Sequence, residues 1–321
     1  MNENPENSAV AAQRPGPAVD YSVVIPVYRS EKTLAPLFHR LREVFSGLGK
    51  TFEVIFVEDC GQDGSWDVIT ALKAEHPSEI VALTLARNFG QHNATLCGFH
   101  YVRGQWVVTI DDDLQIPPEE IPKLIDEQKR SGAELVYGFF AEKQHGLVQN
   151  LGSLAIQKAC ELTFATKGKG SSFRLIASSL VEKVRAHHQS FVFVDGLLLW
   201  YTRYVSRTQV RHEPRQHGQS GYSLMKLIGL AAHMLFNFTT LPLRWIIYLG
   251  ILTSAASFVL GVVFLIRGLI YSVPVGWSSL AVTIFFVGGV ILLVLGIIGE
   301  YISRIFSLHN ARPQFSIKEI L

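Results

Sequence analysis

Apolar and polar residues alternate in blocks along the first half of the chain. Five short runs rich in β-branched and aromatic residues are typical of strands: Tyr21–Tyr28, Phe52–Glu58, Ile80–Ala86, Trp106–Ile110 and Glu134–Phe140. Four segments with apolar residues at helical spacing lie between them: Thr33–Leu48, Trp66–Glu75, Gln91–Val102 and Glu119–Ser131. Several strand runs lack in-and-out alternation, as in a parallel sheet covered on both faces. The pattern predicts a doubly wound, mostly parallel α/β sheet, whose ligands bind at the carboxyl ends of its strands.

The pattern changes after about residue 146. Apolar residues recur at helical spacing over Leu147–Phe164 and again over Ser223–Phe238. These segments are compatible with helices that pack on the sheet and equally with helices that lie in a membrane interface. Because the next segment is long and apolar, we expect residues 223–240 to form an interfacial helix.

Two long uncharged stretches follow. Trp245–Ile266 has about 22 residues and Leu280–Ile298 about 19, and each is long enough to cross the hydrocarbon of a bilayer. The connecting loop carries only Arg267, whereas both outer flanks are basic. The flanking basic residues are Arg244, Arg304, Arg312 and Lys318. The positive-inside rule therefore predicts a transmembrane hairpin, residues 241–303, with both ends in the cytosol.

These patterns predict five parts of the chain. They are a disordered tail (1–19), a cytosolic catalytic domain (20–222), an interfacial helix (223–240), the hairpin (241–303) and a cytosolic C-terminal tail (304–321). The first residues are polar and rich in Pro and Ala, with no apolar core of a signal peptide.

Composition fits a membrane-bound enzyme better than a nucleic-acid-binding protein. Hydrophobic residues make up 48% of the chain and charged residues only 17%, with a net charge of +2. No basic stripe interleaved with aromatic residues is present, which disfavours nucleic acid as a partner. The three cysteines lie far apart without metal-ligand spacing, as expected of a reduced, cytosolic domain.

The strongest chemical signal is the run Asp111-Asp112-Asp113, directly after a predicted strand. Adjacent carboxylates repel one another unless a cation neutralises them. In extended backbone Asp111 and Asp113 point the same way, and such oxygen ligands suit Mg²⁺ or Mn²⁺. The alternative is a solvated acidic turn, or a cap for the helix predicted at Glu119–Ser131.

A second acidic cluster ends the second predicted strand. Glu58 and Asp59 could accept hydrogen bonds from a nucleotide, whereas Asp63 and Ser65 are expected to cap the next helix. Neither Gly-x-Gly-x-x-Gly nor the full P-loop pattern Gly-x-x-x-x-Gly-Lys-Ser/Thr comes directly after the first strand. The sequence therefore disfavours a nicotinamide- or flavin-dependent dehydrogenase and a P-loop ATPase.

Taken in order, these motifs resemble the GT-A family 2 glycosyltransferases. The matching segments are Ile25–Tyr28, Glu58–Asp59, Asp63–Ser65, Arg87–Gly90 and Asp111–Glu119. The resemblance extends to the C-terminus and is greatest to the polyprenyl-phosphate branch, which includes dolichol-phosphate mannose synthase and the undecaprenyl-phosphate glucosyl- and aminoarabinosyltransferases. It implies a GT-A fold with a membrane hairpin and metal-dependent, inverting transfer of a sugar from a nucleotide sugar to a polyprenyl phosphate.

The resemblance also implies a role for individual residues. The expected metal ligands are Asp111, Asp113 and Gln115. The expected catalytic residues are Asp111, Asp113 and Arg215, and the expected nucleotide-binding residues are Pro26, Tyr28, Asp59, Arg87 and Asp112. The expected contacts to the acceptor phosphate are Ser172, Arg174, Ser220 and Tyr222.

Two departures from the family pattern bear on the chemistry. Ser172 stands where many relatives carry an Asp that is a proposed catalytic base, and Gly221 replaces a lysine of the phosphate-binding loop. The missing base matters little, because a phosphate monoester has a second pKa of about 6 and is therefore already a nucleophilic dianion at cytosolic pH. The enzyme has mainly to position it and to offset the charge on the leaving diphosphate.

Two other functions remain compatible with the sequence. A processive polysaccharide synthase shares the fold, but the Gln of its Gln-x-x-Arg-Trp motif is missing before Arg244-Trp245. A degenerate membrane protein that only binds nucleotide would explain Ser172 and Gly221. A UDP-sugar donor is favoured, with a slight preference for glucose or aminoarabinose. Neither the polyprenyl lipid nor the oligomeric state, a homo-oligomer included, is fixed by the sequence.

Overall fold

The computed structural model describes residues 19–139, 171–187, 192–213, 276–309 and 313–321, together with individual residues between 245 and 270. The chain divides into two compact units. The first is an α/β domain, which includes the last nine residues, Pro313–Leu321; the second contains the long apolar helix α11. Three predicted segments lie outside the described residues: the N-terminal tail to residue 18, the helix at 147–164 and the interfacial helix at 223–240.

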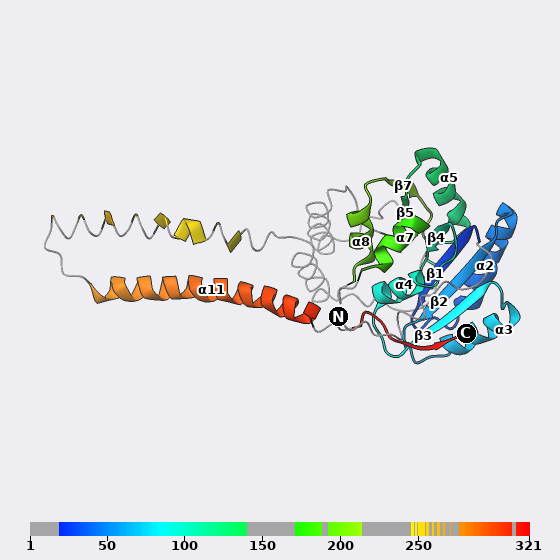
Figure 1. Cartoon of the computed structure of the whole chain (residues 1–321), viewed down its shortest axis with the longest axis horizontal. Coiled ribbons are helices and arrows are strands. Elements are labelled where there is room, and N and C mark those ends of the chain that lie inside the picture. Colours follow the sequence, from blue (N-terminus) through cyan, green and yellow to red (C-terminus); the bar gives the residue numbers. More distant parts are fainter. Residues whose placement is uncertain are drawn as a thin grey trace. The chain divides into compact units, whose positions relative to one another are not determined.

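Eight strands form one sheet in the α/β domain, in the order β7-β5-β6-β4-β1-β2-β3-β8. Figure 1 labels β7, β5, β4, β1, β2 and β3 of this sheet. Their bounds are β1 Tyr21–Val27, β2 Phe52–Glu58, β3 Ile80–Leu85, β4 Trp106–Thr109, β5 Leu135–Phe139, β6 Arg174–Ala177, β7 Val205–Gln209 and β8 Ile317–Ile320. Strands β4, β1, β2 and β3 are parallel neighbours, and β5 pairs in parallel with β7. Strands β6 and β8 run antiparallel to their neighbours. The predicted α/β fold with a mostly parallel sheet is confirmed.

The helices of this domain agree with the predicted pattern over its first half. Their bounds are α2 Leu34–Leu48, α3 Ser65–Glu75, α4 Gln91–Phe99, a 3-10 turn η1 Pro118–Glu120, α5 Ile121–Ser131, α7 Ser178–Arg185 and α8 Val194–Tyr201. The elements β6, α7, α8 and β7 were not predicted. Each has only four to eight residues, too few to show a clear period.

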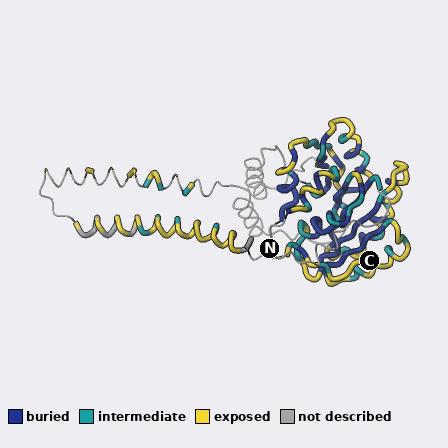
Figure 2. The backbone as a smooth tube through the Cα atoms, in the orientation of Figure 1, coloured by how far each residue is buried: buried dark blue, intermediate teal, exposed yellow. Residues whose placement is uncertain are grey.

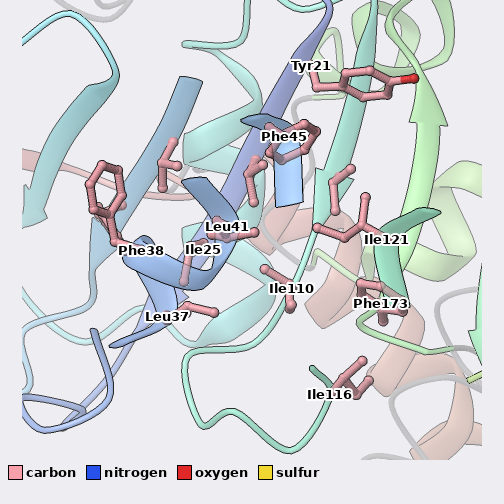
Figure 3. Close-up of a cluster of buried hydrophobic side chains, with 14 of the residues drawn as sticks. Tyr21, Ile25, Leu37, Phe38, Leu41, Phe45, Ile110, Ile116, Ile121 and Phe173 are labelled. Carbon is pink, nitrogen blue, oxygen red and sulfur yellow. The ribbon is translucent and has the colours of Figure 1, made fainter. Parts of the chain in front are cut away.

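Both faces of the sheet are covered, which explains the continuous apolar strands. Val23 and Val24 are adjacent in β1 and both are fully buried, but they belong to cores on opposite faces. One core joins the sheet to α2, α3 and α5, and Figure 3 shows its side chains, among them Ile25, Phe45 and Phe173. The other joins the sheet to α4, α7 and α8.

The last residues of the chain are part of the sheet. Residues 304–321 were expected to be a cytosolic tail, but α11 continues to His309 and Ile317–Ile320 form β8, antiparallel to β3. Phe315 is buried in the core, and its ring lies 5.4 Å from that of His100. Strand β8 has four mostly exposed residues, so its sequence carries no clear strand signal.

Helix α11 spans Trp277–His309 and contains the second predicted membrane segment. Its window Phe286–Ser303 has a mean hydropathy of 2.1 and no buried residue, so the helix is long and apolar enough to cross a membrane. In Figure 2 the described residues of α11 are coloured mostly as exposed, whereas the strands of the sheet are coloured mostly as buried. It is the one helix in the described part of the chain with these properties. Of the first predicted segment, 245–266, only individual residues are described.

Candidate active site

The acidic motifs lie at one edge of the sheet. Strands β1, β2, β3 and β4 are parallel, so the loops that follow them emerge at the same edge. Hydrogen bonds join these loops to one another. Four non-glycine residues in the described chain have positive φ, and all four follow these strands: Arg29, Cys60, Gln62 and Leu114. Such backbone is strained by about 1–2 kcal/mol for each residue and is concentrated at functional sites.

Asp111 is oriented by two hydrogen-bond donors from other elements. Its Oδ1 accepts a bond from Nε2 of Gln91, the first residue of α4, at 2.6 Å. Its Oδ2 accepts a bond from the Ser172 hydroxyl at 2.5 Å. The carboxylate is thus held between α4 and the residues that lead into β6.

The other two carboxylates of the run accept hydrogen bonds from backbone N–H groups. Asp112 accepts a bond from the backbone N–H of Tyr28 at 2.9 Å, and burial raises its pKa to about 6. Asp113 accepts a bond from the backbone N–H of Gln115 at 3.1 Å, and the side-chain Oε1 of Gln115 lies 3.1 Å from Nε2 of His212. Asp112 therefore ties the end of β4 to the end of β1.

The donor set fits a divalent cation that also binds substrate. Asp111 and Asp113 are half-buried and supply carboxylate oxygens, the ligands that Mg²⁺ and Mn²⁺ prefer. Within the residues that the structure describes, no group of three or more His, Cys, Asp and Glu side chains is arranged to hold a metal ion. One or two carboxylates suffice where substrate phosphates and water complete the coordination.

Asp59 holds the loop that follows β3. Its two carboxylate oxygens accept the backbone N–H groups of Phe89 and Gly90, each at 2.7 Å, and burial raises its pKa. The neighbouring Glu58 binds the N–H of Gly61 and the hydroxyl of Thr84. These acids therefore shape the loops after β2 and β3.

The residues predicted to cap α3 also link two loops. The helix begins at Ser65, and Gly64 before it makes no side-chain capping bond. Asp63 accepts the backbone N–H of Ser65 at 3.3 Å, which satisfies a free donor of the first turn as predicted, and it also accepts the Ser65 hydroxyl at 2.8 Å. That hydroxyl oxygen accepts the backbone N–H of Ser30 at 2.9 Å. The pair links the loops after β1 and β2.

The remaining predicted nucleotide contacts lie around the same edge. Pro26 is buried within β1, next to the carboxyl end of the strand, and Tyr28 just beyond it is 45% exposed. Arg87 is exposed, and its guanidinium lies 4.6 Å from the centre of the Phe89 ring. An exposed tyrosine at this edge is suited to stack against a flat ring.

Arg174 was expected on the acceptor side, but it is buried in the interior. Only 3% of it is exposed, and its Nε donates to Oδ1 of Asp195 at 2.8 Å. The Tyr137 hydroxyl donates to the same oxygen at 3.0 Å. Three other predicted residues, Arg215, Ser220 and Tyr222, lie outside the described residues.

Sequence reasoning assigned no role to Gln91, Thr109, Asp195 or His212, which the structure brings into or next to this site. Asp195 had a usable signal, because it is the single charged residue in the apolar run Val192–Trp200. A carboxylate in such a run needs a buried partner. The contact of Gln91 with Asp111 had none, since it depends on how α4 crosses the sheet.

Comparison with known proteins gives two kinds of similarity. Residues 22–182 match the family described as glycosyl transferase family 2. The undecaprenyl-phosphate 4-deoxy-4-formamido-L-arabinose transferase of Pseudomonas aeruginosa (strain LESB58) is 35% identical over 96% of this chain and 92% of its own. The protein of the same name from Shewanella sediminis is 32% identical over 94% of this chain and 92% of its own.

A solved structure shares the fold. It is glucosyl-3-phosphoglycerate synthase from Mycobacterium tuberculosis in complex with Mn²⁺, UDP and phosphoglyceric acid. The TM-score is 0.51 at 15% identity, with 70% of this chain and 82% of that chain covered.

Proposed function

Because the chain belongs to glycosyl transferase family 2, we propose that it transfers a sugar from a nucleotide sugar to a polyprenyl phosphate at the cytosolic face of a membrane. One observation carries this proposal: relatives that cover 96% of the chain are named as transferases for undecaprenyl phosphate. The likeness spans the apolar C-terminal part as well as the α/β domain. Undecaprenyl phosphate is therefore the acceptor to test first.

The relatives also suggest a donor. Their name specifies 4-deoxy-4-formamido-L-arabinose, and the solved structure of similar fold holds UDP. A UDP-linked 4-deoxy-4-formamido-pentose is the first candidate, with UDP-glucose next. The nucleotide would lie against Tyr28 and the loop held by Asp59.

The acceptor phosphate acts as the nucleophile. Its dianion attacks the anomeric carbon while the bond to the nucleotide diphosphate breaks, so one displacement inverts the configuration. Asp111 and Asp113 would hold a divalent cation, which supplies positive charge to offset that of the leaving diphosphate. Arg215 would add charge on the acceptor side. Asp112 accepts the backbone N–H of Tyr28 and so ties the β1 and β4 loops together, and it would lie beside the nucleotide.

The C-terminal strand supports the membrane topology. Residues up to Glu213 and residues from Pro313 belong to one α/β domain, on one side of any membrane. The intervening segment therefore crosses a bilayer an even number of times or not at all. With α11 as one crossing, two crossings are the smallest even number, which is the predicted hairpin. The basic residues on both flanks would place the α/β domain in the cytosol.

The test is transfer of labelled sugar to undecaprenyl phosphate by the full-length protein in detergent. The donors are UDP-4-deoxy-4-formamido-L-arabinose, UDP-glucose and GDP-mannose, with Mg²⁺ or Mn²⁺ present. We expect lipid-linked label from one UDP-sugar, lost with EDTA and with Asp113→Asn. Folded protein that binds nucleotide and transfers label from no donor would contradict the proposal, and retained anomeric configuration would contradict the single displacement.

A further inference from the structure

A chain of hydrogen bonds runs from the interior of the α/β domain to the carboxylate of Asp111. Asp195 accepts the Nε–H of Arg174 at 2.8 Å, and Nη1 of Arg174 donates to the Thr109 hydroxyl at 3.2 Å. That hydroxyl donates to the backbone carbonyl of Ser172 at 2.5 Å. The Ser172 side chain then donates to Asp111. This series of hydrogen bonds thus ends on Asp111, one of the two carboxylates assigned to the cation.

The inner end of this chain is an ion pair with almost no access to water. Arg174 is 3% exposed and Asp195 is 8% exposed. Desolvating two charges costs several kcal/mol for each ion, and apolar residues of similar volume often give equal or greater stability. Stability alone therefore does not account for the pair. A buried pair does fix the positions of its two side chains, because moving one away would leave the other as an unpaired charge in the interior.

Thr109 converts that fixed geometry into a fixed position for Ser172. The residue is the last of β4, two residues before Asp111. Its hydroxyl has one proton, and because Arg174 occupies a lone pair, the proton is directed at the Ser172 carbonyl. The backbone of Ser172 is thereby held at the distance from which its Oγ reaches Asp111.

We propose that Asp195, acting through Arg174 and Thr109, is a positioning residue that holds Ser172 against Asp111 and so orients Asp111 for the divalent cation. Groups that orient metal ligands from behind typically change metal affinity by about 10- to 100-fold when they are removed. The inference rests on the proposed function only for the presence of the cation. The inference also gives Arg174 a role in positioning Ser172, in place of the expected contact with the acceptor phosphate.

The sharpest test compares Thr109→Val with Thr109→Ser in the full-length protein in detergent. Valine keeps the shape of the side chain and removes the hydroxyl, whereas serine keeps the hydroxyl and removes the methyl group. Binding of Mn²⁺ alone is measured from the electron paramagnetic resonance signal of free Mn²⁺. We expect Thr109→Val to weaken Mn²⁺ binding by about tenfold. Thr109→Ser should bind as the wild type does.

Asp195→Asn tests the inner end, and Glu53→Gln is its matched control. Glu53 is a fully buried carboxylate paired with Arg103 at 2.8 Å, and it lies at the amino end of β2, at the edge of the sheet opposite the acidic motifs. Both variants should lower the melting temperature, because each removes one charge of a buried pair. Only Asp195→Asn should also weaken Mn²⁺ binding.

Three results would overturn the inference: equal Mn²⁺ binding by Thr109→Val and Thr109→Ser, an effect of Asp195→Asn on melting temperature alone, or no Mn²⁺ binding by the wild type. The proposed function fails separately. If the wild type binds Mn²⁺ with the expected differences among variants but transfers no sugar, the positioning role stands and the assignment of the reaction falls.

Discussion

The carboxylate of Asp59 accepts the backbone N–H of Gly90 at 2.7 Å, across a sequence separation of 31 residues. The same carboxylate binds the N–H of Phe89, so the end of β2 fixes the loop that leads from β3 into α4. Because α4 begins with Gln91, which binds Asp111, this contact also sets the position of one support of the acidic motif.

We expect Asp59→Asn to loosen this loop. The amide of asparagine has one acceptor oxygen and turns an N–H donor toward a backbone donor, so at least one bond to a charged acceptor, worth about 1.5–3 kcal/mol, is lost. The melting temperature should fall and the KM for the sugar nucleotide should rise. Asp67→Asn, an exposed residue of α3, is the control and should change neither. Unchanged KM and melting temperature in Asp59→Asn would contradict this role.

Removal of residues 313–321 should expose the outer edge of β3. The N–H of Ala82 donates to the Leu321 carbonyl, and the N–H of Ala86 donates to that of Ser316. Without these partners both amides should exchange with deuterium faster, as measured by mass spectrometry of peptides that cover β3. Phe315→Ala should have a similar effect, because it removes a buried ring at a cost of about 3 kcal/mol. Lys318→Ala, on the exposed face, is the control, and equal exchange in all variants would show that β8 does not pair with β3.

His92 should make stability depend on pH below neutrality. Burial lowers its pKa from 6.5 to about 4 in the folded protein. Between these values the unfolded chain binds a proton that the folded one does not, so this histidine's contribution to stability falls as the pH drops from about 6.5 to 4. We expect His92→Gln to reduce the loss of melting temperature between pH 7.5 and pH 5. An identical loss in the variant would contradict the burial of the neutral ring.

Two glycine-to-alanine substitutions should act in opposite directions. A Cβ on Gly104 would lie 2.4 Å from the backbone nitrogen of Ser22, so the strand or the turn must move, at a cost of about 1–3 kcal/mol or more. A Cβ on Gly47, within α2, meets nothing within 4 Å. Because alanine favours helix by about 1 kcal/mol over glycine, Gly47→Ala should stabilise the domain. In thermal denaturation, Gly104→Ala should lower the melting temperature and Gly47→Ala should raise it.

Accessible cysteines would test the membrane topology. A cysteine introduced at Ser272, between the predicted spans, should react with a membrane-impermeant maleimide added to intact cells. A cysteine at the exposed position Lys318 in β8 should react only after the membrane is opened. Labelling of Lys318→Cys in intact cells would contradict a cytosolic α/β domain, and failure to label Ser272→Cys until lysis would contradict the hairpin.

Much of the fold was determined by the sequence alone, because its signals are local. The strands β1 to β5 and helices α2 to α5 follow from blocks of apolar residues whose period differs between strand and helix. The acidic run after β4 was likewise placed at the carboxyl edge of the sheet, since that position follows from the order of elements. The family resemblance added the fold type and the class of reaction.

Only the tertiary structure decided how distant residues meet. Arg174 was read as an acceptor contact because its motif is local, but its environment is set by Asp195 and Tyr137, which come from other elements. Strand β8 is too short and exposed to have a pattern of its own, and it forms because β3 offers a free edge and the core accepts Phe315. Hydrogen-bond geometry depends on the crossing of helices and strands far apart in the chain, and residue spacing does not carry that information.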